Sequence, residues 1–103
     1  MMSLRKKPAP APNRKINAQQ MMRVIARQAP VSADEMTPEY KLMLAVIGQA
    51  VRDLTFGNFY TGARHFFNGS VFRYYCSALG MSAQATRELL VRGGFLLVDG
   101  ALT

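Results

Sequence analysis

The sequence has few of the residues that catalysis and covalent cross-linking require. Its 103 residues include one cysteine, Cys76, one histidine, His65, and no tryptophan. A single cysteine excludes an intramolecular disulfide and a cysteine cluster for zinc. Apart from the adjacent Asp34 and Glu35, the six carboxylates stand singly along the chain, which argues against a paired acid–base site and against a cation site. We therefore expect no enzyme, no metal and no cofactor.

Long apolar runs are also missing. The longest, Leu42 to Ile47, is far too short to cross a bilayer. The first residues, MMSLRKKPAPAP, include cations but lack the continuous apolar stretch of a secretory signal. We expect no membrane partner and a cytoplasmic location. Half of the residues are hydrophobic, which is enough for one globular core and too many for a wholly disordered chain.

Acidic residues are missing from the first 33 positions, although seven of the 13 Lys and Arg residues lie there. From Asp34 onward six cations balance six acids, so the net charge of +7 belongs to the N-terminal part. A basic arm on a neutral body is typical of a protein with a polyanionic partner, most often a nucleic acid. A solubilising tail is the alternative interpretation.

The proline pattern separates this arm from the rest of the chain. Alternating prolines at positions 8, 10 and 12 predict an extended, disordered arm over residues 1–15. A single helical domain is predicted over residues 16–103. The cations of the arm, which are the candidates for contacts with phosphates or a minor groove, are Arg5, Lys6, Lys7, Arg14 and Lys15.

Apolar residues at helical spacing predict an all-α domain of four to five helices, over residues 17–28, 38–54, 59–68, 71–79 and 82–92. Their expected N-caps include Asn17, Thr37, Ser70 and Ser82.

Helix 38–54 is apolar around much of its circumference, which predicts either a central place in the core or one half of a homodimer interface. Met43, Ile47 and Val51 are the candidates for that interface. The C-terminal FLLVDGALT has a strand-like apolar run and a turn signal. We rank core packing of this segment above a hairpin or an added strand.

Residues 70–92 predict a helix, a glycine-pivoted turn and a second helix, as in a helix-turn-helix. Cys76 is small enough for the second helix to cross closely, and Gly80 can adopt the left-handed conformation of the turn. Leu79 and Met81 are expected to be buried on either side of it. Thr86 departs from the pattern, because Val or Ile is normally buried at its position. An ordinary corner between two helices is the alternative.

In the DNA-binding interpretation the second helix presents its polar residues to the major groove. Gln84 would read adenine, Arg87 would bind guanine or a phosphate, and Ser82 would hold a phosphate at the helix start. Arg73 would add a phosphate contact from the preceding helix, and Arg92 would do so from the end of the second. The same residue types are also typical of an ordinary solvent-exposed helix face.

Three segments, AVIGQAVRDL (45–54), ARHFF (63–67) and VFRYYCSALGMSAQATRELL (71–90), resemble a recurrent pattern in small proteins of bacteriophages, prophages and integrative elements. In that pattern an AVxxQAxxDL helix precedes an ARxW/F helix and an FxxxCxxxGLDPDxxR corner. The matching residues are Ala45, Val46, Gln49, Ala50, Asp53, Leu54, Ala63, Arg64, Phe72, Cys76, Gly80 and Arg87. This chain departs from the pattern at residues 81–84, where Met-Ser-Ala-Gln replaces an acidic turn with proline. The resemblance implies a regulator of a mobile element and identifies no ligand or target.

These observations lead to three hypotheses. The first is a small bacterial or phage-type transcription regulator that binds DNA as a homodimer, through the helical corner and the basic arm. The alternative is an adaptor or anti-activator that docks on a regulator or on RNA polymerase through its apolar helices. A weaker third hypothesis is a nucleic-acid-packaging or ribosome-associated protein. A basic, exposed second helix would favour DNA, whereas an apolar or buried one would favour a protein partner.

Overall fold

Five α-helices build the part of the chain that the computed structural model describes, residues 15–31 and 33–97. They are α1 (Ala18–Ala26), α2 (Pro38–Asp53), α3 (Gly57–Phe67), α4 (Ser70–Leu79) and α5 (Ala83–Arg92), with a short 3₁₀ helix η1 (Ala33–Glu35) between α1 and α2. No β-strand occurs in these residues, so the predicted all-α class is confirmed. Most of the predicted arm lies outside the described residues.

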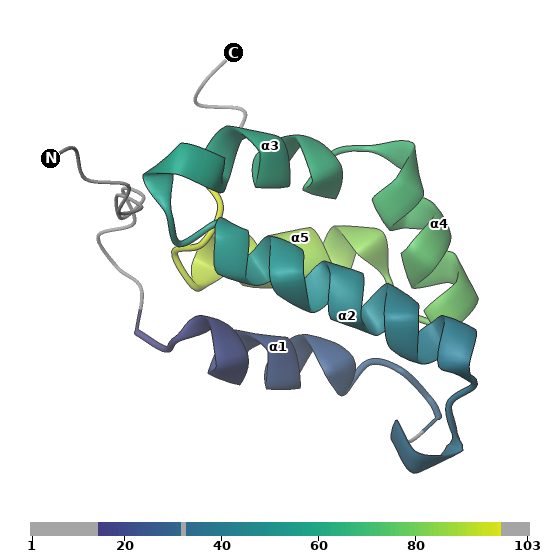
Figure 1. Ribbon diagram of the computed structural model, residues 1–103. Coiled ribbons are helices and arrows are strands. Elements are labelled where there is room, and N and C mark those ends of the chain that lie inside the picture. Colours follow the sequence, from purple (N-terminus) through teal and green to yellow (C-terminus); the bar gives the residue numbers. More distant parts are fainter. Residues whose placement is uncertain (1–14, 32, 98–103) are drawn as a thin grey trace, which may run out of the picture.

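Helix α2 lies at the centre of the domain (Figure 1). Helix α1 runs antiparallel beside it, α3 lies along its other side, and α5 passes behind it in this view. Helix α4 joins α3 to α5 at one end of the domain, and it packs against both of them and against α2. Of the two places predicted for the 38–54 helix, the central one is therefore observed.

Three of the predicted N-caps are confirmed. The Asn17 carboxamide oxygen accepts a hydrogen bond from the Gln20 amide at 2.8 Å, and Gln20 accepts one from the Asn17 amide in return. The Thr37 hydroxyl accepts from the Tyr40 amide at 3.2 Å, and the Ser82 hydroxyl accepts from the Ala85 amide at 3.0 Å. Each cap pairs a backbone N–H that would otherwise have no partner at the start of its helix.

Two helix starts differ from the predictions. Gly69, not Ser70, is the N-cap of α4, and it supplies no side-chain bond, while Ser70 is the first helical residue. Helix α3 begins at Gly57, two residues before the predicted start. Its N-cap is Phe56, again without a capping hydrogen bond from the side chain. Sequence reasoning missed both starts because neither depends on a polar capping side chain.

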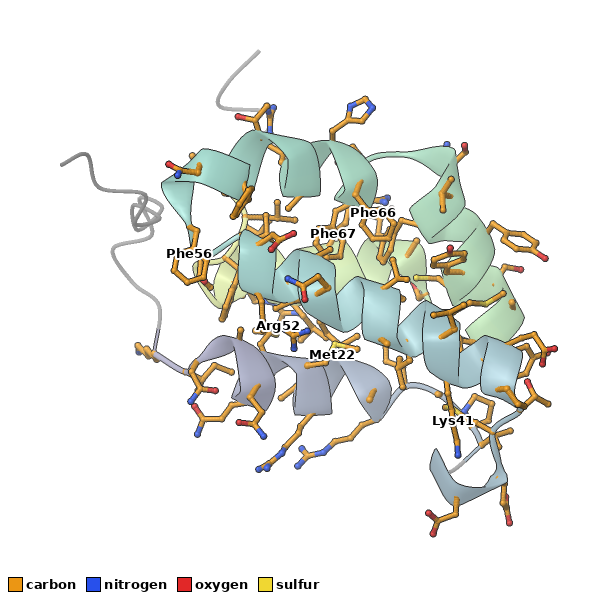
Figure 2. The ribbon with its side chains drawn as sticks, in the orientation of Figure 1. Met22, Lys41, Arg52, Phe56, Phe66 and Phe67 are labelled. Atoms are coloured by element: carbon orange, nitrogen blue, oxygen red, sulfur yellow. The ribbon has the colours of Figure 1, made fainter. Side chains whose placement is uncertain are left out.

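The core is formed by side chains from all five helices. The largest fully buried side chains come from Ile25, Ile47, Val51, Leu54, Phe67, Phe72, Leu90 and Phe95. Phe67 and Phe72 pack edge to face with their ring centroids 4.9 Å apart, and Figure 2 shows Phe66 and Phe67 between α3 and α2. Phe95 and Leu96 are buried after α5, as core packing of this segment predicts. Residues 98–103 lie outside the described part.

Two of the three residues expected at a homodimer interface lie instead in the core of the single chain. Ile47 and Val51 have no exposed surface at all, and Met43 packs partly buried against the same core. Since Ile47 and Val51 are covered by the other helices of their own chain, they are not available to a second copy. The breadth of the apolar stripe on α2 reflects its central position.

The α4–α5 corner has the geometry that its glycine predicts. Gly80 adopts φ 75° and ψ 23°, the Met81 amide donates to the Cys76 carbonyl at 2.8 Å, and the Gly80 amide donates to the Ser77 carbonyl. These two bonds form the Schellman motif that ends a helix at a left-handed residue. A Cβ atom at Gly80 would lie only 2.7 Å from Cδ of Pro30. Glycine is therefore required both by the turn and by the close approach of Pro30.

The unexpected Thr86 is fully buried, and its hydroxyl is satisfied by a residue from the end of α1. Gln28 donates from Nε2 to the Thr86 hydroxyl at 2.7 Å, and that hydroxyl donates to the Ser82 carbonyl at 2.8 Å. Gln28 also accepts a hydrogen bond from the Ser82 amide at 3.3 Å. A hydroxyl thus suits this position because Gln28 completes its hydrogen bonding.

We expect Gln28→Leu to lower the free energy of unfolding by about 1–2 kcal/mol, because it leaves the buried Thr86 hydroxyl without its donor. The double variant Gln28→Leu with Thr86→Val should lose less than the sum of the two single variants, because neither polar partner then remains unpaired. Urea unfolding followed by circular dichroism measures all three. Gln19→Leu, an exposed glutamine on α1, is the control and should change stability by less than about 0.5 kcal/mol. Strictly additive effects would contradict the coupling.

Candidate nucleic-acid interface

The outward face of α5 is the candidate interface. Thr86 and Leu90 point into the core, whereas Gln84, Glu88 and Arg92 are exposed. The helical period separates these two sets onto opposite sides of the helix. Ser82 is exposed as well, and its hydroxyl already accepts a bond within the cap. A polar stripe along α5 therefore follows directly after the glycine-pivoted turn.

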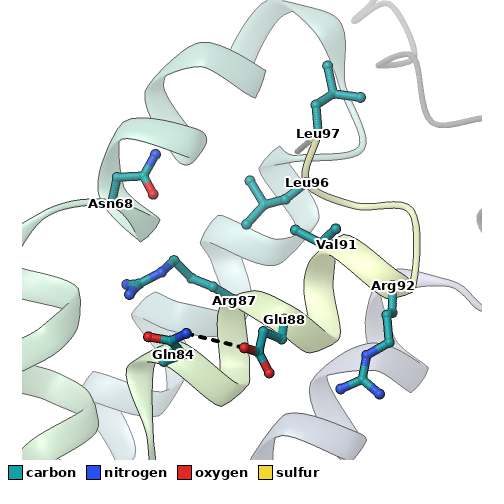
Figure 3. A pocket seen from close by; sticks show the side chains of 8 residues that line it. All are labelled: Asn68, Gln84, Arg87, Glu88, Val91, Arg92, Leu96 and Leu97. Carbon is teal, nitrogen blue, oxygen red and sulfur yellow. Dashed lines mark hydrogen bonds between the residues drawn. The ribbon is translucent and has the colours of Figure 1, made fainter. Parts of the chain in front are cut away.

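A shallow pocket of about 400 Å³ lies beside this face, and Figure 3 shows the side chains that line it. Its lining residues are Asn68, Gln84, Arg87, Glu88, Val91, Arg92, Leu96 and Leu97. The set combines two cations, one acid and three aliphatic side chains. The face is therefore mixed in character, neither strongly basic nor wholly apolar.

Arg87 is engaged with the end of α3. It is half-buried, and its Nη1 donates to the Phe67 carbonyl at 3.2 Å. Figure 3 shows the side chain extending from α5 toward Asn68. Cations are favourable at a helix C-terminus because they pair with the last carbonyl groups and with the negative end of the helix dipole. This contact makes Arg87 a residue that positions α3 against α5, which sequence reasoning did not anticipate.

Gln84 keeps the groups that recognition of adenine needs. One N–H of its amide donates to a Glu88 carboxylate oxygen at 3.2 Å. The second N–H and the carbonyl oxygen remain, and these are the donor and the acceptor of a bidentate contact with adenine. Glu88 places a negative charge on the same face, which opposes the approach of phosphates.

The remaining cations predicted for DNA contact are spread over the surface. Arg73 is exposed on α4 and its Nη1 donates to the Asn68 carbonyl at 3.3 Å, next to the pocket that Asn68 lines. Lys15 and Arg92 are exposed at the start of the described chain and at the end of α5. Residues Arg5, Lys6, Lys7 and Arg14 lie outside the described residues. Arg73 thus contacts the backbone of one residue that lines the pocket, and Arg73 itself is not among the lining residues.

Cys76 is buried beneath the corner. Burial raises the pKa of its thiol to about 11, while the charge of Arg87 and a side-chain hydrogen bond with Thr86 act in the opposite direction. The thiol therefore stays protonated at pH 7, and a protonated thiol is a poor nucleophile. This environment fits a small core residue at the helix crossing.

Sequence reasoning missed a second hollow, which we call the α1–α2 groove. It has a volume of about 580 Å³ and lies between these two helices and η1. Three cations from different turns, Arg23, Lys41 and Arg52, line it. A signal was present in the sequence, because Lys41 and Arg52 are eleven residues apart and so lie on one face of a helix.

No protein-family model, curated protein or solved structure matches this chain. The resemblance to small mobile-element proteins therefore depends on its motif residues alone. No helix in the described part is long and apolar enough to span a membrane. Within that part, no three side chains of His, Cys, Asp or Glu gather where they could hold a metal ion. The fold and the site define an all-α domain with a glycine-pivoted helical corner.

Between about pH 9 and pH 11 we expect Cys76 to lower the free energy of unfolding by about 2 kcal/mol. The unfolded chain ionises its thiol near pH 9, whereas the folded chain holds the proton until about pH 11. Stability is therefore lost as pH rises through this window and is unaffected below it. Urea unfolding across the window, compared with Cys76→Ala, isolates the effect from other titrating groups. A stability difference between the two proteins that does not change with pH would contradict the prediction.

Proposed function

We propose that this protein is a small cytoplasmic DNA-binding transcription regulator of bacterial or mobile-element type. The observation that carries the proposal is the α4–α5 corner. Gly80 turns the chain, Ser82 caps α5, and α5 buries one face while it exposes the other. A helix-turn-helix uses this arrangement to hold its second helix in the major groove. The resemblance to small proteins of mobile elements supports the same class.

The contacts that we propose are shared between two helices. Gln84 reads a base edge, and Arg92 and Arg73 bind phosphates on either side of it. Ser82 holds a phosphate with the exposed backbone at the start of α5. Arg87 positions α5 through the Phe67 carbonyl, so base recognition is left to Gln84.

The N-terminal cations supply most of the electrostatic affinity in this proposal. The arm, residues 1–15, has five cations and no acid, whereas the α5 face combines Arg87 and Arg92 with Glu88. Phosphate contacts made by the arm are independent of sequence, while contacts from α5 select the site. A homodimer remains part of the proposal, through surfaces other than Ile47 and Val51.

A second candidate function is the adaptor or anti-activator that docks on a regulator or on RNA polymerase. The α1–α2 groove favours it, because its lining combines apolar and cationic side chains. This surface shares no lining residue with the pocket beside α5.

We expect Gln84→Ala to weaken binding to a selected DNA site by about tenfold while sparing non-specific binding, because it removes one bidentate base contact. Duplexes selected from a random library and a mobility-shift titration provide the measurement. Glu88→Gln is the matched variant. It should tighten binding at low salt, because it removes a negative charge and keeps an oxygen that can accept from Gln84. No mobility shift at low salt with any selected or genomic fragment would overturn the proposal.

Removal of residues 1–15 should reduce the magnitude of the slope of log affinity against log salt concentration by up to about 4.5, because five cations are lost and each phosphate contact contributes about 0.9. Mobility-shift titrations at several salt concentrations measure the slope. A full-length variant with glutamine at those five positions should behave in the same way, since charge and not length carries the effect. An unchanged slope would show that the arm does not contact DNA.

A further inference from the structure

The α1–α2 groove is walled by one face of each of two antiparallel helices. On α1 its lining residues recur at positions 19, 22, 23 and 26, and on α2 at 41, 44, 45, 48 and 52. Both sets follow the three- and four-residue spacing of a single helix face. Asp34 and Met36 close the remaining side. The result is a shallow, open hollow between two helix faces, and two adjacent helix faces form a surface on which a third helix can pack.

The floor of this groove is apolar and built from small or flexible side chains. Its apolar and small members are Met22, Ala26, Met36, Leu44, Ala45 and Gly48. A Cβ atom added at Gly48 would meet Cγ of Met22 at 3.6 Å, an ordinary contact distance, so the α1–α2 packing does not require a glycine there. Its absent side chain keeps the floor low, and flexible Met side chains adapt to different apolar partners.

Cations stand at the rim of the groove. Figure 2 shows Arg52 and Met22 between α1 and α2, with Lys41 on α2 nearer to η1. Within residues 15–31 and 33–97, the side chains of Arg23 and Lys41 make no hydrogen bond or ion pair. Arg52 donates to the Gln49 side chain at 2.9 Å. Asp34 is the one acid among the described lining residues, so three cations outnumber it.

The length of the groove matches a short helix. Lys41 and Arg52 are eleven residues apart on α2, a rise of about 16 Å. A helix laid along this distance makes about three turns. Carboxylates placed at its two ends would therefore reach both cations, while apolar side chains between them cover the floor.

From this geometry we infer that the α1–α2 groove binds an amphipathic helix of a partner protein, with an apolar face and flanking carboxylates. The chain's own first fourteen residues carry cations and no acid, so they do not complement the rim. A second copy docked groove to groove would bring three cations against three. A nucleic acid would satisfy the cations and would leave the apolar floor uncovered. This inference is independent of DNA binding by α5.

A display library of helical peptides about 16 residues long, with every position randomised, tests the inference on the full-length protein. We expect the enriched peptides to be acidic, with apolar residues at helical spacing. Lys41→Glu and Arg52→Glu should each weaken binding of an enriched peptide by about fivefold, because an attractive rim contact becomes repulsive. Arg27→Glu makes the same charge change at the exposed C-cap of α1, outside the groove lining, and it should change affinity less than about twofold.

Circular dichroism and thermal unfolding confirm that each variant remains folded, which the exposure of all three side chains favours. The inference would be overturned if no peptide were enriched, or if the enriched peptides were not acidic. It would also be overturned if Arg27→Glu reduced the peptide affinity as much as Lys41→Glu and Arg52→Glu do. Duplex DNA is the second arm of the test. If its titration changes the amide chemical shifts of the same groove residues in NMR spectra, the groove binds nucleic acid instead. Failure of DNA binding by α5 leaves each of these outcomes unchanged, so the two proposals fail separately.

Discussion

The start of α5 is held by the contact between the segment that follows α1 and the α4–α5 turn. Gln28 bonds both to the buried Thr86 hydroxyl and to the Ser82 amide, and Pro30 packs where Gly80 has no side chain. A nine-residue helix such as α1 is marginal in isolation and needs tertiary packing. The same contact that stabilises α1 therefore fixes the start of α5. Both candidate surfaces depend on it, since one includes α5 and the other includes α1.

The polar bonds at this contact contribute specificity as well as stability. An apolar residue at position 86 would satisfy the core, but it would leave the Gln28 amide without a partner on α5. With threonine at position 86, Gln28 donates to the Thr86 hydroxyl and accepts from the Ser82 amide. These two directional bonds set the position of the segment after α1 relative to the start of α5. Pro30 adds a rigid ring against the left-handed turn. The corner is thus held from outside by a segment that is far away in sequence.

Local signals in the sequence predicted the helices well, whereas contacts between distant residues were out of reach. Helix starts were predicted correctly at Asn17, Thr37 and Ser82, because a cap involves residues only two or three positions apart. The partner of Thr86 is 58 residues away, and no local pattern indicates it. Ile47 and Val51 illustrate the same limit, because an apolar stripe does not reveal whether the covering helix belongs to the same chain. The start of α4 was misplaced because Gly69 caps it without a side-chain bond.

The candidate site was predictable only as a set of exposed residues, and Arg87 shows why. Its position on the second helix of the corner predicts a contact with DNA, but in three dimensions its side chain donates to the Phe67 carbonyl at the end of α3. A side chain that joins α5 to the end of α3 contributes to folding whether or not DNA is bound. Loss of binding after substitution of Arg87 would therefore say little about base recognition. The exposed Gln84 and Glu88, which share one hydrogen bond on the outer surface, separate recognition from folding because their replacement leaves the core intact.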